Sequence, residues 1–190
     1  MSNRILAFAG SARDGSLTKK LLSFTIAAAR ANGGKVEEID LRSFALPLYD
    51  GDLEREQGLP AGALRLREIF KEHNALLIGV TEYNGGVSPL LKNAIDWASR
   101  PYRDEPNLAA IRGKIVAMVS CSSGVLGGSR AQAHLRQSFQ VMGCVLVPET
   151  VTIPFADGAF VNDAPKDPAI RDFIGIVAAR LVDLADRLTS

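Results

Sequence analysis

The sequence has few of the residues that form disulfides or bind metals. Two cysteines, Cys121 and Cys144, and two histidines, His73 and His134, occur among 190 residues and lie far apart. Such counts exclude a disulfide framework and give no cluster with metal-ligand spacing. We therefore expect no bound metal and a reducing, cytoplasmic setting.

An excess of charge of one sign is also missing. The chain has 22 Lys and Arg against 21 Asp and Glu, a net charge of +1. A basic field that would attract nucleic acid is therefore absent. No run approaches the roughly 18 consecutive apolar residues of a membrane span, and the N-terminus leads into a strand pattern without the features of a signal peptide. We expect neither a nucleic-acid partner nor a membrane partner.

Strand and helix signals alternate along the chain and predict an α/β protein. Short continuous apolar runs indicate strands, and apolar residues at helical spacing indicate the helices between them. Repeated units of this kind imply a parallel sheet covered by helices on both faces. The expected strands are 4–9, 35–40, 75–80, 114–119 and 144–147, the last extending toward 153; the expected helices are 16–31, 61–73, 89–99, 129–142 and 167–188.

The chain length fits one domain over residues 1–190. Five strands are the number of a flavodoxin-like sheet, whereas the longer Rossmann arrangement needs six. Strand order cannot be derived from this pattern. The segment 41–60, which contains two prolines and several acidic residues, is expected to be a long loop of the kind that is often functional.

The loop after the first predicted strand has the composition of an anion site. Ser11, Ser16 and Thr18 supply hydroxyl groups, and Arg13 supplies a charged fork at the N-terminus of a helix. This set suits a terminal phosphate dianion. The spacing matches neither the dinucleotide fingerprint nor a P-loop, because a glycine at position 12 and the P-loop lysine are both missing. A simpler alternative is that Ser16 only caps the helix and Arg13 is a solvated charge.

The loop after the third predicted strand offers a place for a planar ring. Glu82, Tyr83 and Asn84 combine an aromatic face with polar groups, and Gly85 permits a close backbone approach. The alternative is a hairpin-like turn with an exposed tyrosine.

The loop after the fourth predicted strand, 120–130, is rich in glycine and serine and can wrap the edge of a ligand. Cys121 is the candidate nucleophile of this loop, but no histidine that could act as its base lies near it in the sequence. The alternative is a small residue packed at a strand end.

Taken together, these motifs resemble the NAD(P)H-dependent FMN reductase family, a flavodoxin-like group that includes bacterial quinone and chromate reductases. The resemblance rests on Gly-Ser-x-Arg-x-x-Ser at 10–16 and on Glu-Tyr-Asn…Ser-Pro-x-Leu-Lys-Asn-Ala-Ile-Asp-Trp at 82–97. It extends to Leu-Pro-Leu-Tyr-Asp at 46–50 and Gly-Gly-x-Arg-Ala-Gln at 127–132. Two positions depart from the family pattern: Thr81 replaces the usual proline, and Thr18 stands where asparagine is common.

The resemblance implies a three-layer α/β/α fold with a five-stranded parallel sheet in the order 2-1-3-4-5. It also implies that the cofactor is FMN and that NADPH or NADH is the electron donor. The hydride passes to flavin N5, so no catalytic side chain is expected. The implied cofactor-binding residues are Ser11, Arg13, Ser16 and Thr18 at the phosphate, Glu82, Tyr83, Asn84 and Gly85 at the ring, and Ser120, Ser123 and Gly124 at its other edge.

The predicted function is an FMN-containing oxidoreductase that passes electrons from NAD(P)H to quinones, flavins or similar small-molecule acceptors in a ping-pong cycle. One alternative is a flavodoxin-type electron carrier without its own NAD(P)H oxidation, although such carriers usually present an acidic surface. Another is a nucleotide-binding or interaction domain without redox activity.

Members of the family commonly form dimers or tetramers, so we expect a homodimer or homotetramer. The Tyr49 loop and the Trp97 helix are the candidate contact faces. Trp97 itself is expected to be a core or interface residue rather than a flavin contact.

Overall fold

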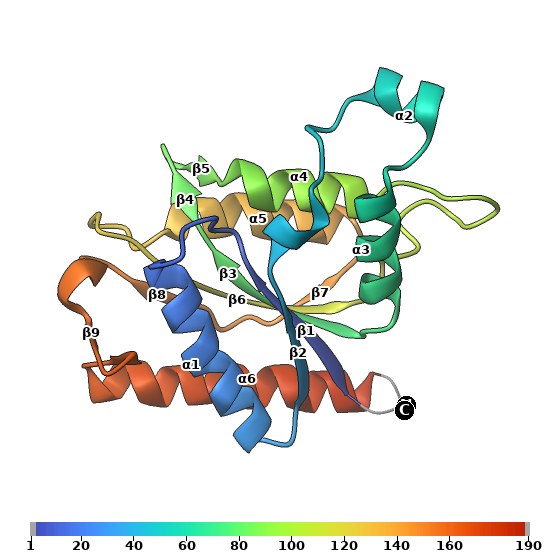
Figure 1. The fold of residues 1–190 in the computed structure, drawn as a ribbon. Helices are drawn as coiled ribbons and strands as arrows, with labels where there is room; N and C mark the ends of the chain where they lie inside the picture. The colour runs from blue at the N-terminus through green and yellow to red at the C-terminus, as the bar shows by residue number, and fades with distance from the viewer. Residues whose placement is uncertain (1–2, 189–190) are drawn as a thin grey trace.

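A computed structural model describes residues 3–188, and a parallel sheet forms its central layer (Figure 1). The strands lie in the order β2-β1-β3-β6-β7, with β8 also paired to β6. Every pairing within this sheet is parallel. The strands are β1 (Arg4–Ala9), β2 (Lys35–Ile39), β3 (Ala75–Val80), β6 (Ile115–Cys121), β7 (Val145–Leu146) and β8 (Val151–Ile153).

The predicted fifth strand is interrupted. Its first piece, β7, pairs with the beginning of β6, and its second piece, β8, pairs with the end of β6. Pro148 lies in the break, where a residue without an N–H cannot continue the hydrogen-bond ladder. Counted as one strand, the two pieces give the predicted order 2-1-3-4-5, which is therefore confirmed.

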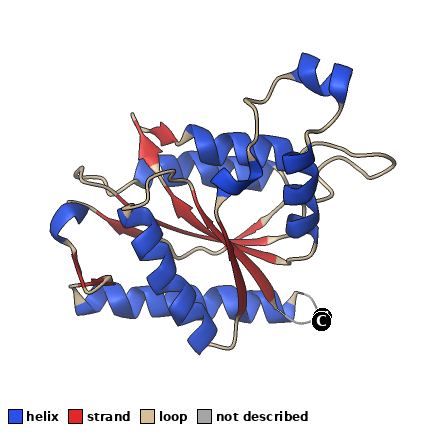
Figure 2. Cartoon of the chain, in the orientation of Figure 1, coloured by secondary structure: helices blue, strands red, loops and turns tan. Residues whose placement is uncertain are grey.

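Helices cover both faces of the sheet and complete the predicted three layers (Figures 1 and 2). Alternate residues of β1 enter different cores, as the two-residue period of a strand requires. Ile5 and Ala7 pack in the core with α1 and α6, whereas Leu6 and Phe8 pack in the core with α3, α4 and α5. The helices are α1 (Leu17–Ala31) and α6 (Pro168–Arg187) on one face, and α3 (Ala61–Lys71), α4 (Pro89–Ala98) and α5 (Ser129–Val141) on the other.

The prediction of a long irregular loop over 41–60 was wrong. This segment contains a 3-10 helix, η1 (Leu41–Phe44), and a short helix, α2 (Gly51–Gln57). No residue of α2 is buried, and in Figure 1 the helix stands out from the body of the protein. A helix that buries no apolar stripe leaves no periodic signal in the sequence, which is why it was missed.

Several short elements also occur at the loops, and of these only the hairpin-like turn after the third strand was considered, as an alternative. Most of them have only two residues per strand, too few to show a period. They are the hairpin β4 (Glu82–Tyr83) and β5 (Gly86–Val87), the hairpin β9 (Phe160–Val161) and β10 (Ala164–Pro165), and the 3-10 turn η2 (Ala156–Gly158).

The segment before α2 is attached to α4. Asn93 and Trp97, one helical turn apart, both donate side-chain hydrogen bonds of 2.8 Å to the Pro47 carbonyl. The Tyr49 ring packs edge-on against Trp97, with 5.0 Å between ring centroids. Trp97 is fully buried within the chain, in agreement with the predicted core position. Within residues 3–188, no helix is both long and apolar enough to cross a bilayer.

The N-terminus of α4 contacts the loop that follows β1. Ser88 is the N-cap residue of α4, but its hydroxyl makes no capping bond and instead donates to the Gly10 carbonyl at 2.6 Å. A Cβ atom at Gly10 would lie 2.7 Å from Ser88 Oγ and 2.9 Å from Leu91 Cβ. Glycine at this position therefore permits the close approach of loop and helix.

We expect Gly10→Ala to lower the free energy of unfolding by about 1–3 kcal/mol, because overpacking forces the loop away from α4. Chemical denaturation measures this. Gly15→Ala in the same loop is the matched control, since a Cβ there has nothing within 4 Å. Equal stability of the two variants would contradict the close-approach argument.

Candidate functional site

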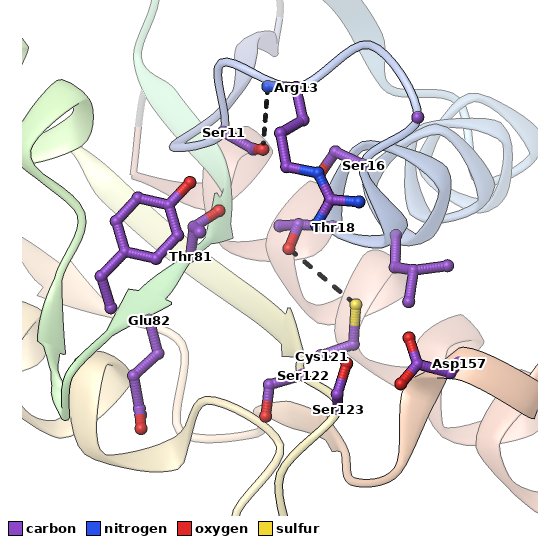
Figure 3. Close-up of a pocket in the computed structure, with 13 residues that line it drawn as sticks. Ser11, Arg13, Ser16, Thr18, Thr81, Glu82, Cys121, Ser122, Ser123 and Asp157 are labelled. Carbon is purple, nitrogen blue, oxygen red and sulfur yellow. Dashed lines mark hydrogen bonds between the residues drawn. The ribbon is translucent and has the colours of Figure 1, made fainter.

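The loops after β1, β3, β6 and β8 meet at the carboxyl edge of the sheet and line a cavity of about 390 Å³ (Figure 3). Ligands of open α/β sheets bind at this edge, and the volume is in the range of small-molecule sites. The lining residues are Ser11, Arg13, Gly15, Ser16, Leu17, Thr18, Thr81, Glu82, Tyr83, Cys121, Ser122, Ser123 and Asp157.

The cavity brings together residues that the sequence predicted from three separate loops. Those that line it are Ser11, Arg13, Ser16, Thr18, Glu82, Tyr83 and Ser123. The predicted residues that lie outside its lining are Asn84, Gly85, Ser120 and Gly124.

The first loop presents hydroxyl groups at the start of α1. Ser16 caps this helix, because its Oγ accepts a hydrogen bond of 3.3 Å from the Lys19 N–H, and it also lines the cavity. Ser16 therefore caps the helix, as the alternative proposed, but it also lines the cavity and is not limited to that role. Ser11 Oγ accepts a hydrogen bond of 3.3 Å from the Arg13 N–H. The Ser11 hydroxyl donates no hydrogen bond among residues 3–188, so its proton can be donated to a ligand.

Arg13 supplies positive charge at the same place. Figure 3 shows its guanidinium over the cavity, on the side of Ser16 and Thr18. Within residues 3–188, this guanidinium has no ion pair with a carboxylate. A positive charge beside the N-terminus of a helix favours a bound anion.

The second loop is a tight hairpin. Asn84 (φ 52°) and Gly85 (φ 80°) both have left-handed backbone and form the turn between β4 and β5. This is the geometry for which Asn-Gly is the preferred pair. The hairpin alternative is therefore confirmed. Tyr83, which is 46% exposed, still lines the cavity.

Glu82 attaches the hairpin to α5. Its carboxylate accepts hydrogen bonds from Arg130 Nη2 at 2.8 Å and from the Ala131 N–H at 3.1 Å. The N-cap residue of α5 is Gly128, which has no side chain, so Glu82 caps this helix from the hairpin. Burial acts to raise the pKa of Glu82, but the bonds from Ala131 and Arg130 outweigh it and hold the pKa below its usual value.

In the third loop, the Ser120 side chain hydrogen-bonds within the protein and does not line the cavity. The Ser120 hydroxyl is buried, donates to the Gly127 carbonyl at 2.7 Å and accepts from Gln132 Nε2 at 2.7 Å. Ser122 and Ser123 line the cavity instead. The Gly124 carbonyl accepts a hydrogen bond of 3.2 Å from the Phe155 N–H, which joins this loop to the one after β8.

The loop after β8 contributes a site residue that the sequence analysis missed. Asp157, in η2, lines the cavity opposite the first loop (Figure 3). The available signal was an acidic residue next to a glycine, shortly after a strand. The strand was expected to extend toward 153, but no site was predicted in the loop that follows it.

Thr81 provides an orphaned polar atom beside the cavity. Its Oγ1 is buried and has no hydrogen-bond partner among residues 3–188. Leaving a buried hydroxyl unpaired costs about 1–3 kcal/mol, and a polar ligand atom in the neighbouring cavity would offer a partner. This residue replaces the proline common at the position, so the departure adds a polar group to the site.

Cys121 is a packed thiol rather than an activated one. It is 5% exposed, and its Sγ lies 3.9 Å from Thr18 Oγ1. Burial raises the pKa of Cys121 to about 11, which keeps the thiol protonated at neutral pH. The structure favours the packing alternative over a nucleophile.

Residues 3–158 match the family described as NADPH-dependent FMN reductase. A quinone reductase of Escherichia coli (strain K12) is 45% identical over 92 residues, which are 48% of this chain and 46% of that protein. The match therefore spans about half the length of that relative. An NAD(P)H-dependent FMN reductase of Pseudomonas aeruginosa is 38% identical over 135 residues, 71% of this chain and 68% of that one.

Solved structures are similar over almost the whole chain. FerB of Paracoccus denitrificans, a flavoenzyme NAD(P)H:(acceptor) oxidoreductase, has a TM-score of 0.80 and 30% identity, covering 97% of this chain and 98% of its own. An archaeal flavodoxin has a TM-score of 0.60 at 12% identity, covering 98% and 99%, and shows the fold alone.

The raised pKa predicts slow modification of Cys121. In a Cys144→Ser background, we expect iodoacetamide to alkylate Cys121 at pH 8 roughly 100-fold more slowly than free cysteine, because so little thiolate is present. The rate should rise about tenfold per pH unit between pH 8 and 10, as the thiolate fraction does. Mass spectrometry of the intact protein measures it, with the denatured protein as the control. Rapid labelling at neutral pH would indicate an activated thiolate.

Proposed function

The chain belongs to the NADPH-dependent FMN reductase family, and from this membership and the geometry of the cavity we propose that it is an NAD(P)H-dependent FMN oxidoreductase. Its acceptors would be quinones, flavins or similar small molecules. The observation that carries the proposal is the Arg13 guanidinium, which has no carboxylate partner within residues 3–188 and lies beside the N-terminus of α1.

The donor set suits a phosphate followed by a polar ring system. Ser11, Arg13, Ser16 and Thr18 would hold the phosphate of FMN, since hydroxyls, a guanidinium and helix N–H groups are its usual ligands. Tyr83 would contact the ring, and the orphaned hydroxyl of Thr81 would find its partner there. Bound FMN would supply hydride acceptance and electron release, chemistry that no side chain of the chain supplies.

Four other predicted site residues would support the cavity, Glu82 from its lining and Ser120, Asn84 and Gly85 from outside it. Glu82 fixes the hairpin on α5, and Ser120 fixes the third loop on Gln132, so each orients a neighbour that faces the ligand. Asn84 and Gly85 form the turn that places Tyr83. We assign none of these four to direct contact with the cofactor through a side chain.

The open side of the cavity suggests the order in which electron donor and acceptor bind. Tyr83 and Arg13 are both exposed, so the cavity is accessible from solvent between the first and second loops. Electron donor and acceptor would use this opening in turn, which gives a ping-pong cycle. The homodimer or homotetramer, the single domain over residues 1–190 and the cytoplasmic setting stay predictions.

The activity is tested by mixing the purified protein with FMN, NADPH or NADH, and a quinone. We expect a flavin absorbance spectrum on the protein and nicotinamide oxidation that requires the quinone, with parallel double-reciprocal plots. Flavin binding without nicotinamide oxidation would instead indicate an electron carrier. A protein that takes up no FMN would be an interaction domain.

Arg13→Ala should weaken FMN binding by roughly 1.5–3 kcal/mol, the range for a hydrogen bond to a charged group. Riboflavin, which has no phosphate, should bind the variant and the unaltered protein alike. Fluorescence quenching of the flavin measures both dissociation constants. Arg4→Ala, which removes an exposed arginine paired with Glu72 at the opposite edge of the sheet, is the control. An unchanged FMN affinity in Arg13→Ala would rule out this arginine as a phosphate ligand.

A further inference from the structure

A second arginine contacts the first loop from outside the cavity. Arg42 lies in η1, which is fixed to the core by the buried side chains of Leu41 and Phe44. Its Nε and Nη2 donate to Asp40 Oδ2 at 3.1 and 2.8 Å. The hydrogen bonds from Arg42, together with Lys19, hold the pKa of Asp40 well below its usual range. Asp40 therefore stays ionised and keeps the guanidinium in one orientation.

The remaining edge of this guanidinium faces the loop. Arg42 Nη1 donates to the Ala12 carbonyl at 2.8 Å and lies 3.0 Å from Asp14 Oδ1. Both partners belong to the loop between β1 and α1, some 30 positions away in the sequence. Arg42 does not line the cavity itself.

The Ala12 carbonyl belongs to the peptide that leads to a cavity residue. In a trans peptide the C=O and the N–H point in opposite directions. With its carbonyl directed at Arg42, this peptide presents the Arg13 N–H to Ser11 Oγ at 3.3 Å. Ser11 Oγ thus serves as an acceptor on that side, and its proton is left to donate toward the cavity.

A second carbonyl of the loop, that of Gly10, also accepts a hydrogen bond from a side chain outside the cavity lining. Gly10 C=O accepts from Ser88 Oγ, and Ser88, like Arg42, lies outside the lining of the cavity. A carbonyl oxygen turned toward a phosphate would repel it. The Gly10 and Ala12 carbonyls both accept hydrogen bonds from residues outside the cavity lining. Both oxygens are therefore directed away from the place where an anion would lie.

We propose that Arg42 is a positioning residue for the cofactor phosphate: it holds the Ala12–Arg13 peptide so that the Ser11 hydroxyl is a donor to the anion. The inference rests on the proposed function, because it takes the phosphate to be that of FMN. Arg42 acts through Ser11 and makes no contact with the ligand.

The shape of the arginine side chain matters as well as its charge. A guanidinium can donate to Asp40 with one edge and to the Ala12 carbonyl with the other, whereas a lysine ammonium has no such fork. Exposed ion pairs contribute little to global stability. The effect of losing Arg42 should thus be found in loop order and ligand affinity.

The experiment compares Arg42→Ala and Arg42→Lys with the control Arg4→Ala. Dissociation constants for FMN and riboflavin are measured by fluorescence quenching, and amide hydrogen exchange of Arg13 is measured in the flavin-free protein. We expect both Arg42 variants to bind FMN about 3- to 10-fold more weakly, the effect of one hydrogen bond, with riboflavin changed less than about twofold. Exchange at the Arg13 amide should become faster by a similar factor, and Arg4→Ala should change none of these.

Unchanged exchange at Arg13 in Arg42→Ala would overturn the positioning role, whether or not flavin binds. Equal losses for FMN and riboflavin would also overturn it, because the effect would not concern the phosphate. Full FMN affinity in Arg42→Lys would show that the positive charge alone is sufficient. It would contradict the requirement for a guanidinium that donates from two edges. If the unaltered protein binds no FMN, the proposed function fails, and the exchange measurement still decides whether Arg42 holds the peptide.

Discussion

The two hydrogen bonds of Ser88 join the first loop to the second and are the constraint on which the cavity depends. Its N–H donates to the Thr81 carbonyl at 3.0 Å, and its hydroxyl donates to the Gly10 carbonyl at 2.6 Å. Ser88 is fully buried, so water does not compete for either bond. The absence of a side chain at Gly10 makes the distance possible. Ser88, at the start of α4, thus fixes the spacing between the first loop and the hairpin.

The remaining loops are joined in the same pairwise manner. Glu82 links the hairpin to the start of α5, and the backbone of Ser122 and Gly124 links the third loop to η2 through bonds from Ala156 and Phe155. Arg42 adds a link from η1 to the first loop. Each contact lies behind the cavity or at its rim and uses carbonyl or carboxylate acceptors. The hydroxyl and guanidinium donors are left facing inward, which is the arrangement that an anionic ligand requires.

The sequence predicted the sheet and the first-loop residues that line the cavity because both depend on local signals. The apolar run of β3 is fully buried, and β1 alternates between two cores, as parallel strands covered on both faces require. The role of Glu82 was not predictable, since its partners lie 48 and 49 positions along the chain. Asp157 was missed although the last strand was expected to extend toward 153, because no site was predicted in the loop that follows it. The helix α2 buries nothing and left no pattern to read.

Three serines at the ends of strands and the starts of helices show why such residues cannot be assigned from sequence alone. Ser16 caps its helix, Ser88 donates to another loop, and Ser120 binds a glutamine and a carbonyl of its own loop. A hydroxyl donates once, accepts twice and rotates freely, so its role follows from whichever partner the tertiary fold brings near. At Ser16 and Ser11 the hydroxyl oxygens accept hydrogen bonds from backbone N–H groups, and among residues 3–188 neither hydroxyl donates one, so both protons can be donated to a ligand. At Ser88 and Ser120 the proton is already donated inside the protein. The donors offered to an anion therefore come from the first loop, where, within the described part of the chain, two hydroxyl protons and the Arg13 guanidinium have no carbonyl or carboxylate partner.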